Sequence, residues 1–212
     1  MATTTSTAAV TSLASVTLEV ADPEAARRFY TAFGVEAYLH LRASDTHSTG
    51  FRGFTLGLTV SGPATVDGFL GAAVDAGATV LKPATKSLWG YGAVVQAPDG
   101  TIWKIATSAK KDTGPDTREI DEVVLLLGVE SVKATKQFYV ARGLTVAKSF
   151  GSKYVEFAPG RSCPVKLALY KRRALAKDLG VPTDGTGSHR IVLGTTTDAF
   201  TDPDGFTWQP AV

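Results

Sequence analysis

The chain has 212 residues, a formal net charge of +2, and 44% hydrophobic against 20% charged residues. This balance is ordinary for a globular protein of one large or two small domains. It excludes an extended basic surface for nucleic acid, and the longest apolar run, residues 123–127, is too short to cross a bilayer. The single cysteine, Cys163, favours a reducing compartment, so we expect a cytoplasmic protein without nucleic-acid or membrane partners.

The first half of the chain predicts strands and helices after a disordered leader, residues 1–12, which is rich in Thr, Ala and Ser. Residues 13–20 predict a strand. Asp22-Pro23-Glu24 then begins a helix that Gly34 ends. Further strands are predicted at 35–41, 54–60, 78–83, 93–96 and 102–106, with a helix at 65–76 and an aromatic, glycine-rich loop at 87–92.

The second half follows a charged segment, residues 110–118, that contains Gly and Pro and predicts a linker. A strand at 120–127 leads into a helix that Gly143 ends. The remaining predicted elements are strands at 144–149, 154–157, 165–170, 191–195 and 206–209 and a short helix at 171–179.

Several features of the first half occur again in the second. A Pro-Asp-Gly turn precedes a Trp-containing strand at residues 98–103 and at 203–208, and a Phe-Tyr pair lies in a helix at 29–30 and at 138–139. The paired positions are about 105 to 110 residues apart, which indicates a duplicated domain. We therefore predict a first domain at 13–109, a linker at 110–118 and a shortened second domain at 119–212, each half forming its own curved, mostly antiparallel sheet.

These stretches resemble the vicinal oxygen chelate superfamily, which includes glyoxalase, bleomycin resistance protein and extradiol dioxygenase. The resemblance covers residues 13–107 and 119–210. It is carried by residues 16–22, 28–30, 53–56, 73–83, 89–91, 167–170 and 174–182 and by both Pro-Asp-Gly turns. It implies an α+β fold of tandem βαβββ modules, with curled, mostly antiparallel sheets around a cleft and helices on the outside.

The resemblance also implies where a metal would be bound. Metal-dependent members of the family use His or Gln on the first strand of a module and Glu on the last. The first-strand positions fall on Ser15 and Glu122, and the last-strand positions fall on Lys104 and Gln209. Only Glu122 and Gln209 suit a divalent ion, and the ammonium group of Lys104 would repel one. We therefore expect no metal and no cofactor.

A cleft without metal would still be a binding site. The resemblance places Ser15, Lys104, Glu122 and Gln209 around it and Trp89 at its border, so these five are the candidate substrate-binding residues. No catalytic residue is assigned. Alternatively, Lys104 and Glu122 pair with each other across the joint between the halves and only fill the former metal site.

The leading hypothesis is a glyoxalase-like or bleomycin-resistance-like protein that binds a small, partly aromatic molecule in this cleft. One alternative is a lyase or dioxygenase of the same superfamily, with a rearranged metal site or with metal-free acid–base chemistry by Glu122 and Lys104. Another is a degenerate interaction module. A homodimer and a pseudo-dimeric monomer fit the sequence equally well.

Overall fold

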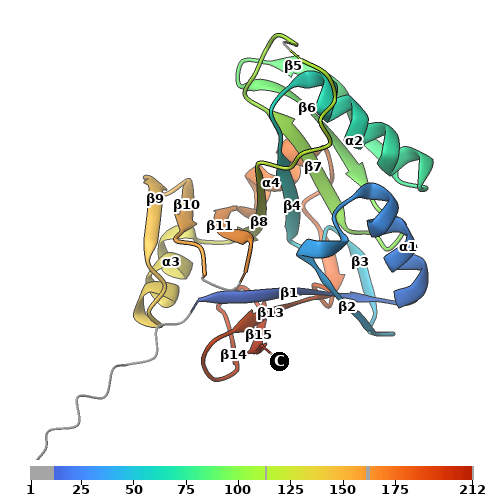
Figure 1. Cartoon of the computed structure of the whole chain (residues 1–212). Helices are drawn as coiled ribbons and strands as arrows, with labels where there is room; N and C mark the ends of the chain where they lie inside the picture. The colour runs from blue at the N-terminus through green and yellow to red at the C-terminus, as the bar shows by residue number, and fades with distance from the viewer. Residues whose placement is uncertain (1–11, 113, 161–162, 212) are drawn as a thin grey trace, which may run out of the picture.

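The computed structural model describes residues 12–112, 114–160 and 163–211, so the predicted leader lies outside the described residues except for Ser12. Two large mixed sheets and a two-stranded ribbon carry four α-helices in this part of the chain (Figure 1). The elements of the first half are β1 (Leu13–Val20), α1 (Pro23–Phe33), η1 (Glu36–Tyr38), β2 (His40–Ala43), β3 (Ser48–Gly50), β4 (Phe54–Thr59), α2 (Pro63–Asp75), β5 (Thr79–Ser87), β6 (Gly90–Gln96) and β7 (Ile102–Thr107). Those of the second half are β8 (Glu122–Val129), α3 (Val132–Ala141), β9 (Val146–Phe150), β10 (Tyr154–Phe157), β11 (Val165–Lys171), α4 (Arg172–Leu179), β12 (Gly185–Gly187), β13 (Ile191–Thr195), β14 (Phe200–Thr201) and β15 (Thr207–Pro210).

The larger sheet has eight strands in the order β5-β6-β7-β4-β8-β11-β10-β9. It consists of two complete βαβββ units, β4-α2-β5-β6-β7 and β8-α3-β9-β10-β11. Within each unit the first and last strands are parallel, and the two units meet where β4 runs antiparallel to β8, from the pair Phe54–Leu127 to the pair Thr59–Glu122. The predicted α+β fold with mostly antiparallel strands is confirmed.

The five-stranded sheet takes its strands from both ends of the chain, in the order β14-β15-β13-β1-β2. The expectation that each half forms its own sheet is therefore wrong. The reason is that residues 44–53 supply only the short strand β3, which pairs with β12 and not with this sheet, so β1-α1-β2 lacks the strands that would complete its unit. β1 instead pairs with β13, which belongs to the other incomplete unit. The domain boundaries at 13–109 and 119–212 stay a prediction.

Local signals fix the helices as expected. The Asp22 carboxylate accepts from the backbone N–H groups of Glu24 and Ala25 at the start of α1, and Gly34 ends this helix in the left-handed conformation. Helix α1 places Phe33 edge-on against the fully buried Trp103 of β7. The same core contains the inward faces of both large sheets.

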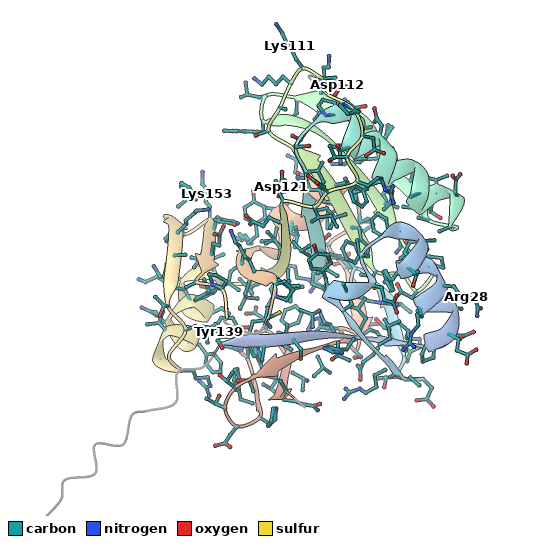
Figure 2. All side chains as sticks on the ribbon, in the orientation of Figure 1. Arg28, Lys111, Asp112, Asp121, Tyr139 and Lys153 are labelled. Carbon is teal, nitrogen blue, oxygen red and sulfur yellow. The ribbon has the colours of Figure 1, made fainter. Side chains whose placement is uncertain are left out.

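The Pro-Asp-Gly turns hold helices in place. The Tyr30 hydroxyl of α1 donates to Asp99 in the first turn at 2.6 Å, with Oδ2 as the acceptor. In α3 the Tyr139 hydroxyl, labelled in Figure 2, donates to Asp202 at 2.5 Å and accepts from Trp208 Nε1 at 3.2 Å. The repeated turns therefore act as buried polar connections between a helix and the final strand of each half.

Two local expectations need correction. Residues 35–41 form the short helix η1 and only the start of β2, and the loop at 87–92 is a tight turn in which Ser87 pairs with Gly90. The predicted linker packs on α2, because Arg118 Nη1 donates to the Gly68 carbonyl and the guanidinium lies 4.4 Å from the centre of the Phe69 ring. None of the helices in the described ranges has the length and apolar character needed to span a membrane.

Candidate functional site

Helix α4 covers the face of the eight-stranded sheet where the sequence predicts an open cleft. Its buried side chains Leu175, Ala176 and Leu179 pack in a cluster with Phe51 and with residues of the sheet, including Val94 and Ile102. Val94 pairs with Lys104 in register, and Ile102 lies two positions before Lys104, so all three project from the same face. The helix therefore occupies part of the face where the cleft was expected.

Two lysines of the sheet hold the end of α4. Lys104 Nζ lies 2.6 Å from the Asp178 carboxylate, and the two side chains are 38% and 42% exposed. Lys82 Nζ donates to the carbonyl oxygens of Lys177 and Asp178. These carbonyl groups belong to the last turn of the helix, where the Lys177 carbonyl also accepts from the Gly180 N–H at 3.2 Å. Lys82 thus caps α4 with a positive charge at the negative end of its dipole.

Between α4 and the β5–β6 hairpin lies a groove of about 460 Å³, called the hairpin groove below. The residues that line it include Lys82, Lys86, Trp89, Tyr91, Lys104 and Asp178. The Trp89 side chain stands at the turn of the hairpin and is 84% exposed. The structure therefore brings together two of the five predicted site residues, Trp89 and Lys104.

Glu122 does not pair with Lys104, the partner that the sequence suggested. Its carboxylate lies 2.7 Å from Lys166 Nζ, and Lys166 is also 3.9 Å from Glu156. The hydrogen bond to Glu122 is the main cause that raises the pKa of Lys166. Lys104 and Glu122 do share a face of the sheet, but strand β4 lies between theirs. The interpretation that these two residues pair with each other is wrong.

Ser15 and Gln209 lie in the five-stranded sheet. Both are register partners of Gly194, which lies on the strand between theirs. A Cβ atom added to Gly194 would lie 2.0 Å from the Ser15 hydroxyl, so this position requires glycine. The Gln209 side chain accepts from Arg42 at 3.1 Å, and Arg42 also pairs with Glu19 at 2.8 Å. Gln209, Arg42 and Glu19 line a polar cavity of about 450 Å³ that shares no lining residue with the hairpin groove. The five predicted residues thus occupy three places.

Comparison of the sequence with protein-family models and with curated proteins found no match. Comparison of the structure with solved structures found glyoxalase I from Zea mays, with a TM-score of 0.58 and 13% sequence identity over 93% of this chain and 91% of that chain. A putative dioxygenase from Bacillus subtilis has a TM-score of 0.54 and 10% identity over 93% of this chain and 83% of its own. This is the vicinal oxygen chelate fold.

A vicinal oxygen chelate fold implies a divalent metal, but the residues at the expected ligand positions do not fit one. Glu122 is paired with Lys166, Gln209 accepts from Arg42, and Lys104 is itself a cation. At these three of the four positions a cation opposes a second positive charge. In the ranges that the structure describes, no three or more His, Cys, Asp or Glu side chains form a group that could hold a metal. A metal-free protein stays a prediction, which elemental analysis of the purified protein checks.

Three residues around the hairpin groove and the polar cavity were not predicted from the sequence. Asp178 and Lys82 shape the hairpin groove, and Arg42 crosses the five-stranded sheet to Gln209. The spacing of Leu175 and Leu179 does indicate a helix with one buried face. It does not indicate which sheet that face covers. The contact between Asp178 and Lys104 could therefore not be predicted from the sequence.

Proposed function

We propose that the hairpin groove binds a small, partly aromatic molecule. The observation that carries the proposal is the position of Trp89, a large aromatic side chain that is almost fully exposed at the edge of a groove. A flat ligand stacked on the indole would remove apolar surface from water and gain the favourable contact of two ring systems.

The rest of the groove supplies polar groups for orienting such a ligand. Lys104 offers ammonium donors and Asp178 offers carboxylate acceptors, and both side chains are only partly buried. A volume of about 460 Å³ lies within the range of about 300–1,000 Å³ typical of small-molecule sites. A few polar groups beside an apolar aromatic surface is the usual composition of such sites.

Tryptophan fluorescence tests the proposal directly. The chain has three tryptophans, and Trp103 and Trp208 are fully buried, so a soluble quencher such as iodide reaches mainly Trp89. We expect a bound aromatic acid, amide or amine from a ligand panel to protect Trp89 from iodide. The ligand should also raise the thermal midpoint of unfolding, because it binds only the folded state.

Two variants serve as controls for this experiment. Trp89→Ala should lose both the quenchable signal and the affinity, whereas the substitution Phe150→Ala, at an exposed aromatic residue on β9, should leave both unchanged. A broad panel in which no compound protects Trp89 would overturn the binding function. The degenerate interaction module would then be the better hypothesis.

We also propose a cytoplasmic location, which the state of Cys163 supports. The thiol is free and buried, and burial raises its pKa. A lone unpaired cysteine is typical of proteins from reducing compartments. Fractionation of cells that express the protein at its native level would check the location.

A further inference from the structure

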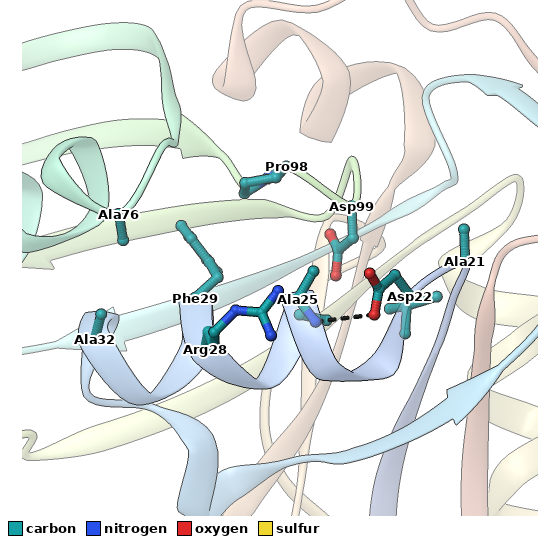
Figure 3. Close-up of a pocket in the computed structure, with 11 residues that line it drawn as sticks. Ala21, Asp22, Ala25, Arg28, Phe29, Ala32, Ala76, Pro98 and Asp99 are labelled. Atoms are coloured by element: carbon teal, nitrogen blue, oxygen red, sulfur yellow. Dashed lines mark hydrogen bonds between the residues drawn. The ribbon is translucent and has the colours of Figure 1, made fainter.

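A third cavity lies against helix α1. Its volume is about 470 Å³, and it is bounded by α1, by the end of α2 and by the first Pro-Asp-Gly turn (Figure 3). We call it the α1 cavity. It shares no lining residue with the hairpin groove or with the polar cavity at Gln209.

The floor of the α1 cavity is apolar. Phe29, which is 4% exposed, forms part of it together with Pro98 and Ala76. Ala25 and Ala32 line it from α1, and their methyl groups are too small to fill the space between the helix and the turn. A floor of this kind favours an aliphatic or aromatic side group that leaves water.

Two carboxylates at one end of the cavity are held in fixed positions. Asp22 Oδ1 accepts from the N–H groups of Glu24 and Ala25, both at 3.0 Å. Asp99 accepts from the Tyr30 hydroxyl at 2.6 Å and from the Thr101 N–H at 2.7 Å. Because an ionised carboxylate has about four acceptor sites, both groups retain capacity for another donor.

A guanidinium group lies at the same end. Arg28 lines the cavity and reaches over α1, and Figure 3 shows its guanidinium on the side of the two carboxylates. Among the described residues Arg28 forms no ion pair within 4.0 Å, although its neighbour Arg27 pairs with Glu36 at 3.6 Å. A second arginine, Arg52, donates to the backbone carbonyl of Asp99.

From this arrangement we propose that the α1 cavity binds a free amino acid with an apolar side chain. The ligand ammonium bonds Asp22 and Asp99, and its carboxylate bonds Arg28. The side chain lies on the floor formed by Phe29 and the alanines. Opposite charges that are too far apart to pair directly leave room for a zwitterion between them, and each of its two charged ends then gains a charge-assisted hydrogen bond.

Leucine and two derivatives test the proposal by calorimetry on the full chain. L-Leucinamide lacks the carboxylate and N-acetyl-L-leucine lacks the ammonium, whereas both keep the side chain. We expect leucine to bind with one site per chain and each derivative to bind at least about tenfold more weakly, because each loses one charge-assisted contact. Equal binding of all three compounds, or no binding of leucine, would overturn the proposal.

Variants assign the two ends of the ligand. Arg28→Gln should weaken the binding of leucine by about tenfold and leave the binding of leucinamide unchanged. The matched control Arg27→Gln should change neither affinity. Asp22→Asn keeps the helix cap, since Asn caps as well as Asp. It should weaken the binding of leucine and of leucinamide but not the binding of N-acetyl-leucine. Equal effects of Arg28→Gln and Arg27→Gln would contradict the site.

A cavity-filling variant separates binding from folding. Ala25→Leu places a larger side chain in the α1 cavity on an exposed helix position, where leucine is also a good helix former. It should abolish leucine binding while the circular dichroism and thermal midpoint stay near those of the wild type. Retained leucine binding in this variant would contradict the location. Failure of this proposal leaves the hairpin groove untouched, because Trp89 protection is measured at a different site.

Discussion

Lys104 is the residue at which the binding proposal and a purely structural role make different predictions. Its ion pair with Asp178 is more than a third exposed on both sides, so the pair should contribute about 0–1 kcal/mol to stability. Lys104→Ala should therefore change the free energy of unfolding little. It should weaken ligand binding by about 1–3 kcal/mol, because a polar group of the ligand loses its partner.

Calorimetry with a ligand found by Trp89 protection, together with urea unfolding, measures both quantities for Lys104→Ala. Asp178→Asn removes the same ion pair, so its free energy of unfolding shows how much the pair itself contributes to stability. A large loss of stability in Lys104→Ala with unchanged affinity would show that the lysine only holds α4.

Asp202 gives stability a dependence on pH. The carboxylate is buried, accepts from the Tyr139 hydroxyl and the Phe206 N–H, and has a pKa raised above the ordinary 3.8, mainly by burial. The folded state thus holds the proton more tightly than the unfolded chain. The contribution of Asp202 to the free energy of unfolding therefore falls as pH rises from about 3.8 through the raised pKa. Above the raised pKa this destabilising contribution no longer changes with pH.

The variant Asp202→Asn does not titrate, and it keeps only one of the two acceptor oxygens, since Oδ2 accepts from Tyr139 and Oδ1 from the Phe206 N–H. The lost acceptor adds a constant cost that does not depend on pH. The variant's free energy of unfolding, relative to the wild type, should rise with pH across this acidic window and then level off. Chemical unfolding at a series of pH values measures the difference. A difference that stays constant from acidic to neutral pH would refute the role of Asp202.

At the scale of elements, α4 contributes a small core of its own on the sheet face that carries Lys104. Leu175 is fully buried in this cluster. Leu175→Ala should cost about 2–5 kcal/mol by leaving a cavity, and should also disturb the hairpin groove through Asp178. Val140→Ala, at a partly exposed site on α3, is the control and should cost about 0.5 kcal/mol or less. Equal costs in denaturant unfolding would mean that α4 is not anchored on the sheet.

The elements themselves were largely predictable, because their signals are local. Asp22 and Gly34 mark the two ends of α1, and the turns at Asp99 and Asp204 precede the final strands. Strand partners were not predictable, since β1 and β8 have similar patterns but lie in different sheets. The residues of the candidate site were the least predictable part. Lys104 and Trp89 do share a groove, but Asp178 comes from a helix whose packing face depends on contacts distant in sequence.

For the whole molecule, the shared sheets predict one cooperative unfolding transition. Strand β4 of the first half bonds to β8 of the second, and β1 bonds to β13, so neither half can unfold without breaking both sheets. Urea unfolding followed by fluorescence and by circular dichroism should give coincident curves. Two separate transitions would instead support independent domains at 13–109 and 119–212.

The pairing of the chain ends in one sheet has a further consequence. Leu13 is the register partner of Thr195, and Thr195 is the partner of Pro210, so the two ends of the described fold are about two strand spacings, or roughly 10 Å, apart. A short peptide bridge between them would close the chain into a ring without moving a strand. Opening that ring at residues 108–121 would give a circular permutant that starts with β8 and ends with β7, and it should reach the same fold.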